Sequence, residues 1–465
     1  MMRITVCALL VALAIGLGRA PAAAQAGETV VLRGGWIFDP EAGTVSRNGG
    51  IVVRNGRFMR VGEVPTAYET GARVVTFADD DYLLPGLFDL HAHYNVNLDG
   101  SGRRDDTVVN PVVFLANGVT STFPGGEYDP ERMLELRQNI DRGLRIGPRL
   151  HNTGPYFGTA REGWNRNATA DDIRRDVDEW AERGVAGFKA KGLALQHLAP
   201  LIERAHAHGL TVTGHLDSGR GGSINAKDAI LLGIDRVEHI MGGDALSRDS
   251  AAYPMWIKVD TASREFRDIV KLFIDHGVFF DATITAPVYF TELKEGFDYW
   301  YDERTLFTPE VQARVRARPA RELNPLMDQL YWTMRRTTKA FYDAGGGHLI
   351  TLGTDLPSSG DFLPGFAAHR ELHTMVLAGL PPAAALRAGT INGARALGVG
   401  DRLGSIETGK WADLFVVRGN PLDDIRNTHN VRMVMKAGVL YDPQELLASV
   451  VGKLGQPTAS DRGGR

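Results

Sequence analysis

Cysteine is nearly absent from this sequence, since the single Cys7 lies within the first ten residues. One cysteine cannot form an internal disulfide, and the rest of the chain has no thiolate to bind a metal ion or act as a nucleophile. Any metal must therefore be held by histidine, carboxylate or modified lysine side chains. With 465 residues the chain is long enough to build a core without disulfides.

Two further features are missing. The 52 basic residues are interleaved with 56 acidic ones and form no basic stripe, so nucleic acid is not expected as a partner. No Gly-x-Gly-x-x-Gly pattern follows a predicted strand, which argues against a dinucleotide-binding fold.

The N-terminus carries an apolar run with the features of a secretory signal peptide. Arg3 precedes the run at residues 4–17, and a small-residue cleavage site, Ala24-Gln25-Ala26, follows it. The run is too short to span a bilayer comfortably. We therefore expect residues 1–26 to be a signal peptide and the protein to be exported, periplasmic or secreted, with no stable membrane span. An uncleaved N-terminal anchor is the alternative.

Short β segments occupy both ends of the remaining chain. Those in residues 27–83 include a hairpin signal at Asn55-Gly56. Similar segments return in residues 401–450, where Ala437-Gly438 forms a turn between two strands. We therefore predict a small β-sandwich built from both chain ends, with a flexible tail at 451–465.

Residues 84–400 alternate amphipathic helices with short apolar strands, a pattern that indicates a parallel sheet. About eight such units favour a closed (β/α)8 barrel over an open doubly wound sheet. The predicted fold class is therefore α/β, a TIM barrel with the small β-sandwich as a second domain. Residues 293–324 are longer than an ordinary connection, and we interpret them as an insertion over the barrel mouth that could act as a lid.

Six polar residues stand at the ends of predicted strands. His91 and His93 are two apart on the first strand, so their side chains face the same way. The other four close later strands: Lys189, His215, His239 and Asp355. Because the carboxyl ends of barrel strands converge, these side chains predict a site for a first-row divalent metal, with zinc as the first candidate. Lys191 shares a strand face with Lys189 and is the alternative to it.

These residues lie in runs that resemble the metal-dependent amidohydrolase superfamily. The opening metal motif of that superfamily is resembled here by the run Leu84-Pro85-Gly86-Leu87-Phe88-Asp89-Leu90-His91-Ala92-His93. There follow, in the order of that family, the strand-ending lysine, His215, Glu238-His239, Gly353-Thr354-Asp355 and Gly404-Ser405-Ile406-Glu407-Thr408-Gly409-Lys410-Trp411-Ala412-Asp413-Leu414. The resemblance covers nearly the whole chain after residue 26.

The resemblance implies two divalent metal ions and a role for each residue. His91, His93 and Asp355 would hold the more buried ion, and His215 and His239 the more exposed one. Lys189, carbamylated by CO2, would bridge the two ions. Asp355 would also be the catalytic residue that takes a proton from the attacking water and passes it to the leaving amine.

The family resemblance is strongest to a branch that contains imidazolonepropionase-like proteins and Xaa-Pro and Xaa-Arg dipeptidases. It implies hydrolysis of an amide in a small acylated amino acid or dipeptide, by an enzyme that we expect to be a homo-oligomer with a small-molecule substrate. A cyclic amide or lactone hydrolase and a deaminase remain alternatives, as does a non-catalytic metal-containing binding protein. Specificity would lie in four loops: 95–106, 156–164, 216–224 and 293–324.

Overall fold

The computed structural model of the chain describes residues 28–96, 103–291, 301–317, 323–357 and 363–455. The predicted signal peptide, with Cys7, lies outside the described residues. Among the helices within them, none combines the length and the apolar character that crossing a membrane requires.

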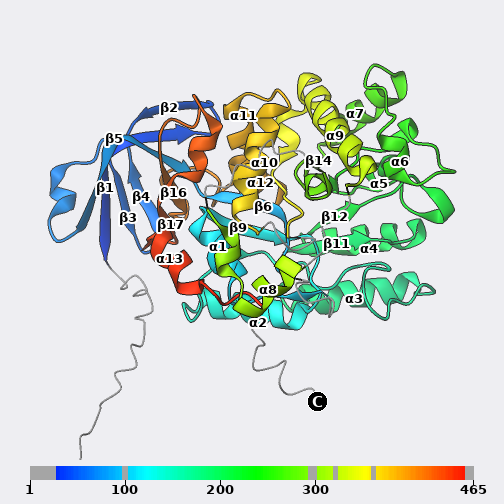
Figure 1. The fold of residues 1–465 in the computed structure, drawn as a ribbon, viewed down its shortest axis with the longest axis horizontal. Coiled ribbons are helices and arrows are strands. Elements are labelled where there is room, and N and C mark those ends of the chain that lie inside the picture. Colours follow the sequence, from blue (N-terminus) through cyan, green and yellow to red (C-terminus); the bar gives the residue numbers. More distant parts are fainter. Residues whose placement is uncertain (1–27, 97–102, 292–300, 318–322, 358–362, 456–465) are drawn as a thin grey trace, which may run out of the picture.

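The two ends of the chain form one mixed β-sheet. Its strands run in the order β18-β17-β16-β5-β1-β3-β4, and β2 (Thr44–Arg47) pairs with β1. At its centre β5 (Arg73–Pro85) lies parallel to β1 (Thr29–Asp39) and antiparallel to β16 (Leu414–Arg418). Figure 1 shows these blue and orange strands side by side. The two chain ends therefore associate as predicted, and they do so in one mixed sheet.

Both predicted hairpin turns are present in this sheet. Asn55 and Gly56, with φ of 51° and 74°, connect β3 (Ile51–Arg54) to β4 (Arg57–Val61). Ala437-Gly438, with φ of 48° and 78°, connects β17 (Val431–Lys436) to β18 (Val439–Tyr441). A turn with two consecutive positive φ angles matches the right-handed twist of the flanking strands. Asparagine and glycine are common in such turns because they adopt a positive φ more readily than other residues.

The middle of the chain forms eight parallel strands in two hydrogen-bonded groups. The first group is β10 (Arg149–Leu150), β9 (Val119–Pro124) and β6 (Leu87–Ala92). The second is β11 (Gly187–Lys191), β12 (Thr211–His215), β13 (Arg236–Glu238), β14 (Phe279–Asp281) and β15 (Ile350–Thr351). Hydrogen bonds outside these ladders join the groups; among them, Leu90 N donates to Leu352 O at 2.9 Å, and Phe157, after β10, bridges to Ala190 of β11. The fold is therefore a mixed α/β fold with parallel strands. A short separate pair, β7 (Asn95–Val96) and β8 (Arg104–Asp105), lies after β6.

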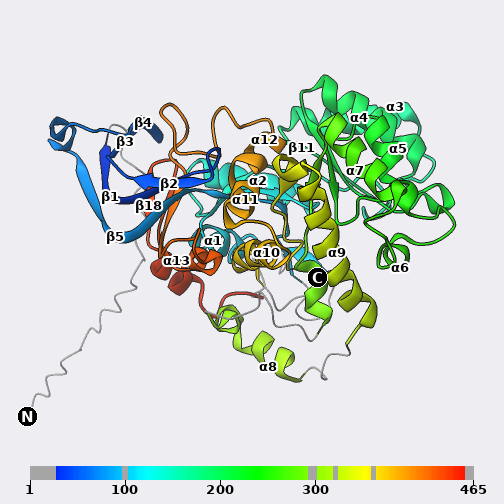
Figure 2. The same cartoon turned by 90° about the horizontal axis from the view of Figure 1, so that it is seen from above.

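Helices alternate with the parallel strands as predicted, and α7 (Arg264–His276) illustrates why. Ser263 caps its first turn, and Gly277 ends it with a φ of 66° that is available to glycine without strain. Its buried face includes Phe266 and Phe273, and the chain then returns directly into β14. Figures 1 and 2 place α3 to α7 at the end of the molecule opposite the mixed sheet.

The remaining helices have the following bounds: α1 (Asn110–Ala116), α2 (Pro130–Asp141), α3 (Ala170–Glu182), α4 (Leu195–Ala207), α5 (Ala226–Leu231), α6 (Ala252–Trp256), α8 (Pro309–Ala317), α9 (Pro325–Asp343), α10 (Phe366–Leu377), α11 (Pro382–Arg387), α12 (Gly393–Ala396) and α13 (Pro443–Val450).

Residues 301–317, the larger described part of the predicted insertion, pack against the end of the chain. Leu454 is fully buried, and its backbone bonds to Leu306 and Thr308 at 2.8 and 3.0 Å. Leu454 is thus packed, whereas Val451 and Lys453 are exposed, and residues 456–465 lie outside the described residues. The parts of the predicted lid at 293–300 and 318–322 also lie outside them.

Candidate metal centre

The six predicted site residues come together at the carboxyl ends of the parallel strands. Lys189 lies in the middle of β11, which continues to Lys191 rather than ending at Lys189 as predicted, and His215 is the last residue of β12. His91 is the next-to-last residue of β6, and His239 directly follows β13. The imidazole rings of His91 and His93 are 5.2 Å apart between centroids, those of His91 and His239 4.9 Å, and those of His215 and His239 4.6 Å. The predicted convergence is therefore present.

Asp355 is the carboxylate on which the imidazoles converge. Its Oδ1 lies 2.7 Å from His93 Nε2 and 3.4 Å from His91 Nε2, and its Oδ2 lies 3.9 Å from His239 Nε2. Burial alone would raise the pKa of Asp355, but its contact with His91 and a hydrogen bond with His93, which a neutral ring can also donate, hold that pKa well below its usual range. The side chain is therefore an ionised carboxylate, able to bind a cation or accept a proton.

The donor set fits a divalent metal ion. Each imidazole keeps one buried nitrogen without a hydrogen-bond partner among the described residues: Nδ1 of His91, His93 and His215, and Nε2 of His239. Burial lowers the pKa of all four imidazoles, which keeps them in the neutral form that binds metals. Ligand atoms of His91, His239 and Asp355 lie within 4.8 Å of one another, as do those of His215, Glu238 and His239. His239 thus belongs to both groups.

The two candidate lysines occupy different environments. Lys189 is fully buried and pairs with the equally buried Glu238, whose other oxygen accepts a hydrogen bond from Thr213 Oγ1 at 2.9 Å. Burial lowers the pKa of Lys189, although Glu238 opposes the shift. Lys191, two residues further along the same strand face, is only partly buried and lines a pocket.

Glu238 belongs to the cluster, although the sequence analysis named it only as part of a motif and gave it no role. In β13 the side chains of Arg236 and Glu238 lie on one face, where Arg236 Nε contacts Asp281 Oδ2 at 2.9 Å and Glu238 meets Lys189. Strict alternation would turn His239 to the opposite face, but its φ of 63° brings its ring back beside Glu238. Alternation along β13 places Glu238 on the same face as Arg236, and this was a signal available in the sequence. Nothing in the sequence indicated the positive φ of His239.

The backbone at the strand ends is strained where the site is built. His239, Thr283 and Asp355 all have positive φ, at 63°, 45° and 54°. Thr283 Oγ1 donates to the carbonyl of Ala282 and lies 2.7 Å from His239 Nδ1. It can therefore accept the Nδ1 proton, which leaves the His239 Nε2 lone pair directed at the site. Strain of this kind persists where surrounding contacts enforce it, as they do here.

A glycine makes room for the first two histidines. A Cβ at Gly125, directly after β9, would lie 2.2 Å from His91 Cδ2 and 3.0 Å from His93 Cε1. Any larger residue would displace these rings. Gly125 therefore contributes to the site by having no side chain.

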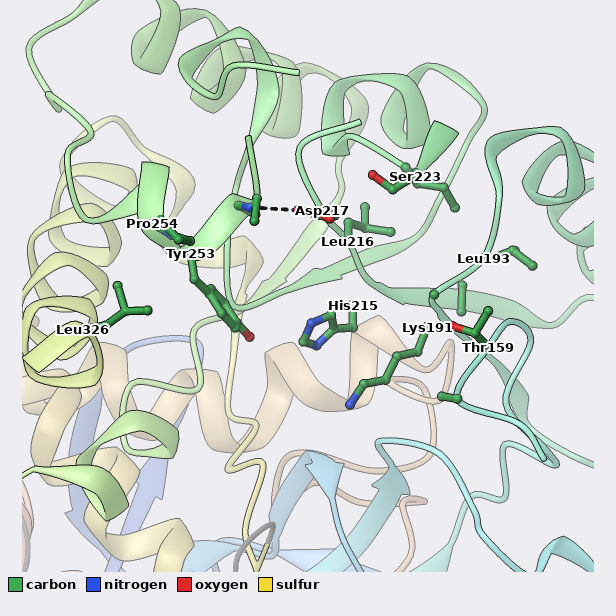
Figure 3. A pocket seen from close by; sticks show the side chains of 16 residues that line it. Thr159, Lys191, Leu193, His215, Leu216, Asp217, Ser223, Tyr253, Pro254 and Leu326 are labelled. Atoms are coloured by element: carbon green, nitrogen blue, oxygen red, sulfur yellow. Dashed lines mark hydrogen bonds between the residues drawn. The ribbon is translucent and has the colours of Figure 1, made fainter. Parts of the chain in front are cut away.

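A pocket of about 550 Å³ adjoins the cluster at His215. Figure 3 shows the Lys191 amine and the Tyr253 hydroxyl on either side of the His215 ring. Two of the predicted specificity loops, 156–164 and 216–224, contribute to its wall, but the segments 190–193 and 251–254 were not predicted. Residues 301–317 are not among those that line it.

Comparisons with known proteins agree with this architecture. The amidohydrolase family matches residues 82–441. An uncharacterised protein of Mycobacterium tuberculosis is 28% identical over 204 residues, 41% of this chain and 52% of that protein. A 5-methylthioadenosine/S-adenosylhomocysteine deaminase of Teredinibacter turnerae is 38% identical over 90 residues, 17% of this chain and 20% of the enzyme. The matched segment thus spans about half the length of the mycobacterial relative and a fifth of the deaminase.

Two solved structures share the fold over most of the chain. A Xaa-Pro dipeptidase with bound methionine has a TM-score of 0.67 at 22% identity, covering 89% of this chain and all of that one. A putative prolidase from Bifidobacterium longum has a TM-score of 0.67 at 24% identity, covering 91% and 99%. At this identity the likeness establishes the fold alone.

Proposed function

Because this chain belongs to the amidohydrolase family, we propose that it hydrolyses an amide C–N bond in a small acylated amino acid or dipeptide. The observation that carries this proposal is the buried cluster in which His91, His93 and His239 surround Asp355 and His215 adjoins His239, with a pocket at His215. The likeness to a Xaa-Pro dipeptidase and a putative prolidase supports an amide as the scissile bond.

Our proposal includes two divalent ions, with zinc as the first candidate. His91, His93 and Asp355 would hold one ion, and His215 and His239 the other. A carbamylated Lys189 would join them, because an unmodified ammonium would repel both cations whereas a carbamate offers two anionic oxygens. The two strand groups would form the closed (β/α)8 barrel that places these residues around one axis.

When bound, the ions would supply a water of lowered pKa and polarise the scissile carbonyl. The remaining chemistry belongs to the chain. Asp355 accepts the proton of the attacking water and passes it to the leaving nitrogen, so that the amine departs neutral. Thr283 holds the His239 ring in place, and Gly125 leaves the rings of His91 and His93 room to approach.

Metal analysis combined with a substrate panel tests the proposal. We expect about two equivalents of metal and release of an amino acid from N-acyl amino acids or dipeptides, both lost on chelation and restored by zinc. Ammonia release from an aminated heterocycle would instead identify a deaminase, which the short match to the Teredinibacter turnerae enzyme keeps as the second candidate. Turnover confined to cyclic amides or lactones would contradict the proposed substrate class. Stoichiometric metal without any turnover would identify a binding protein.

We also propose that the protein is exported and works as a homo-oligomer. The apolar run at residues 4–17 supports export. N-terminal sequencing of the protein recovered from the periplasm or medium should give a chain that begins after Ala26, and light scattering should give a mass above that of one chain. A chain that retains its first residues, or a monomer, would contradict these two proposals.

A further inference from the structure

The pocket beside the metal centre is assembled from loops that follow four consecutive strands. Thr159 comes from the segment after β10, Leu193 from that after β11, Leu216 and Ile224 from that after β12, and Tyr253 from that after β13. Its volume of about 550 Å³ is that of a site for a small organic molecule. Because His215 belongs both to the cluster and to the pocket wall, a molecule in the pocket reaches the cluster directly.

The wall of this pocket is mostly apolar. Leu193, Leu216, Ile224, Pro254 and Leu326 contribute aliphatic surface, as do several alanines. Asp217 is the acidic residue of the wall. Its Oδ1 already accepts hydrogen bonds from the backbone N–H groups of Ser218 and Ala252, each at 2.8 Å. That contact holds the segment that carries Tyr253 (Figure 3).

Lys191 is the cation among the described residues that line the pocket. Within the described part of the chain, no carboxylate oxygen lies within 4.0 Å of its amine, whereas the amine of Lys189 is paired with Glu238. The amine of Lys191 lies 6.0 Å from the centroid of the Tyr156 ring and points toward the same space as His215 (Figure 3). An amine directed into an apolar pocket without a partner attracts an anion.

We infer that Lys191 binds the free carboxylate of the substrate and that the aliphatic wall receives an apolar side chain beside it. This inference rests on the proposed amide hydrolysis and specifies its substrate class: an acylated amino acid or dipeptide that ends in an apolar residue with a free carboxylate. Lys191 is then a specificity residue, whereas Lys189 remains the metal-site lysine.

Binding of a matched ligand pair tests the inference. N-acetyl-L-leucine carries the carboxylate, whereas N-(3-methylbutyl)acetamide has the same acyl group and side chain without it. We expect calorimetry on the metal-loaded protein to show the acid binding at least about 10-fold more tightly, because a charge-assisted hydrogen bond is lost in the analogue. Equal affinity for the two compounds would overturn the role of Lys191, and tighter binding of N-acetyl-L-glutamate than of N-acetyl-L-leucine would overturn the apolar subsite.

Lys191→Met keeps the length of the side chain and removes its charge. We expect this variant to lose the preference for the acid, Lys191→Arg to retain much of it, and Lys227→Met, which removes a surface lysine paired with Asp244, to leave it unchanged. Metal content should equal that of the wild type in all three, and loss of metal in Lys191→Met would show that Lys191 belongs to the metal site instead. In turnover, Lys191→Met should raise KM for the acid with a smaller change in kcat.

Failure of the inference and failure of the proposed function are distinguishable. If the acid binds preferentially through Lys191 but no amide is cleaved, the carboxylate site stands and the proposed hydrolysis falls. If amides are cleaved but Lys191→Met keeps the wild-type preference, the hydrolysis stands and the carboxylate site falls.

Discussion

The mixed sheet of the chain ends and the metal-site cluster among the parallel strands bury different kinds of side chain. The sheet packs a wholly hydrophobic cluster that includes Val30, Phe58 and Leu414. The site-bearing ends of the parallel strands instead bury ionisable groups, among them Lys189 and Glu238. Apolar burial stabilises a fold, whereas buried ions lower stability unless they are well paired. We infer that the mixed sheet contributes stability to the fold, whereas the buried ionisable groups of the site lower its stability and are retained for their chemistry.

The largest expected effect comes from the buried lysine. Lys189→Ala should lower kcat/KM roughly 1,000-fold or more and remove about one equivalent of metal, because the proposed bridge between the ions is gone. Lys191→Ala should keep both equivalents. Metal analysis and steady-state kinetics measure these outcomes, and the reverse result would exchange the roles of the two lysines.

Lys189→Ala also leaves Glu238 buried without its partner, so that a loss of activity could reflect unfolding. The double variant Lys189→Ala/Glu238→Gln removes both charges. It should recover part of the melting temperature that the single variant loses but none of the activity. Recovery of activity would show that Lys189 acts only by neutralising Glu238.

The mixed sheet should respond in the opposite way. Phe58→Ala removes a fully buried ring and should lower the free energy of unfolding by about 3–5 kcal/mol, with kcat per folded molecule and metal content unchanged. Met59→Ala, at the neighbouring position that is 53% exposed, should change stability by less than about 1 kcal/mol. Denaturant unfolding and metal analysis decide this, and metal loss in Phe58→Ala would show that the two regions are coupled.

The sequence predicted the parts of the molecule that depend on local pattern. Asn55-Gly56 identified a hairpin because its two positive φ angles are a local requirement. His91 and His93 were identified because residues two apart on a strand share a face. Glu238 was given no role, although alternation from Arg236 along the strand was an available signal. The 251–254 wall of the pocket was missed because it depends on a hydrogen bond from Ala252 to Asp217, 35 positions away. Lys189 and Lys191 share a face, so only their different burial separates them.

A smaller effect is expected where a hydroxyl orients a ligand ring. Thr283→Val removes the hydrogen-bond partner of His239 Nδ1 and should weaken metal binding about 10- to 100-fold, as measured by competition with a chelator. Thr338→Val is the matched control, since the Thr338 hydroxyl is buried without a hydrogen-bond partner among the described residues. Unchanged affinity in Thr283→Val would mean that packing alone holds the His239 ring.

The smallest expected effect is the contribution of one site imidazole to the pH dependence of stability. Burial lowers the pKa of His239 to about 4, whereas an unfolded histidine titrates near 6.5, so the unfolded chain takes up the proton first as the pH falls. The stability that neutral His239 contributes is therefore present above pH 6.5 and is lost progressively toward pH 4. In metal-free protein, His239→Gln should remove about 2 kcal/mol of the change in unfolding free energy between pH 7 and pH 5, measured by urea denaturation.

His369→Gln should give a similar pH effect without loss of metal in the loaded protein, because burial lowers the pKa of His369 to about 3 in α10, outside the ligand set. If His239→Gln keeps the pH dependence of the wild type, then His239 is not held neutral by burial, and the contrast between an apolar sheet and a site built from desolvated ligands loses one of its supports.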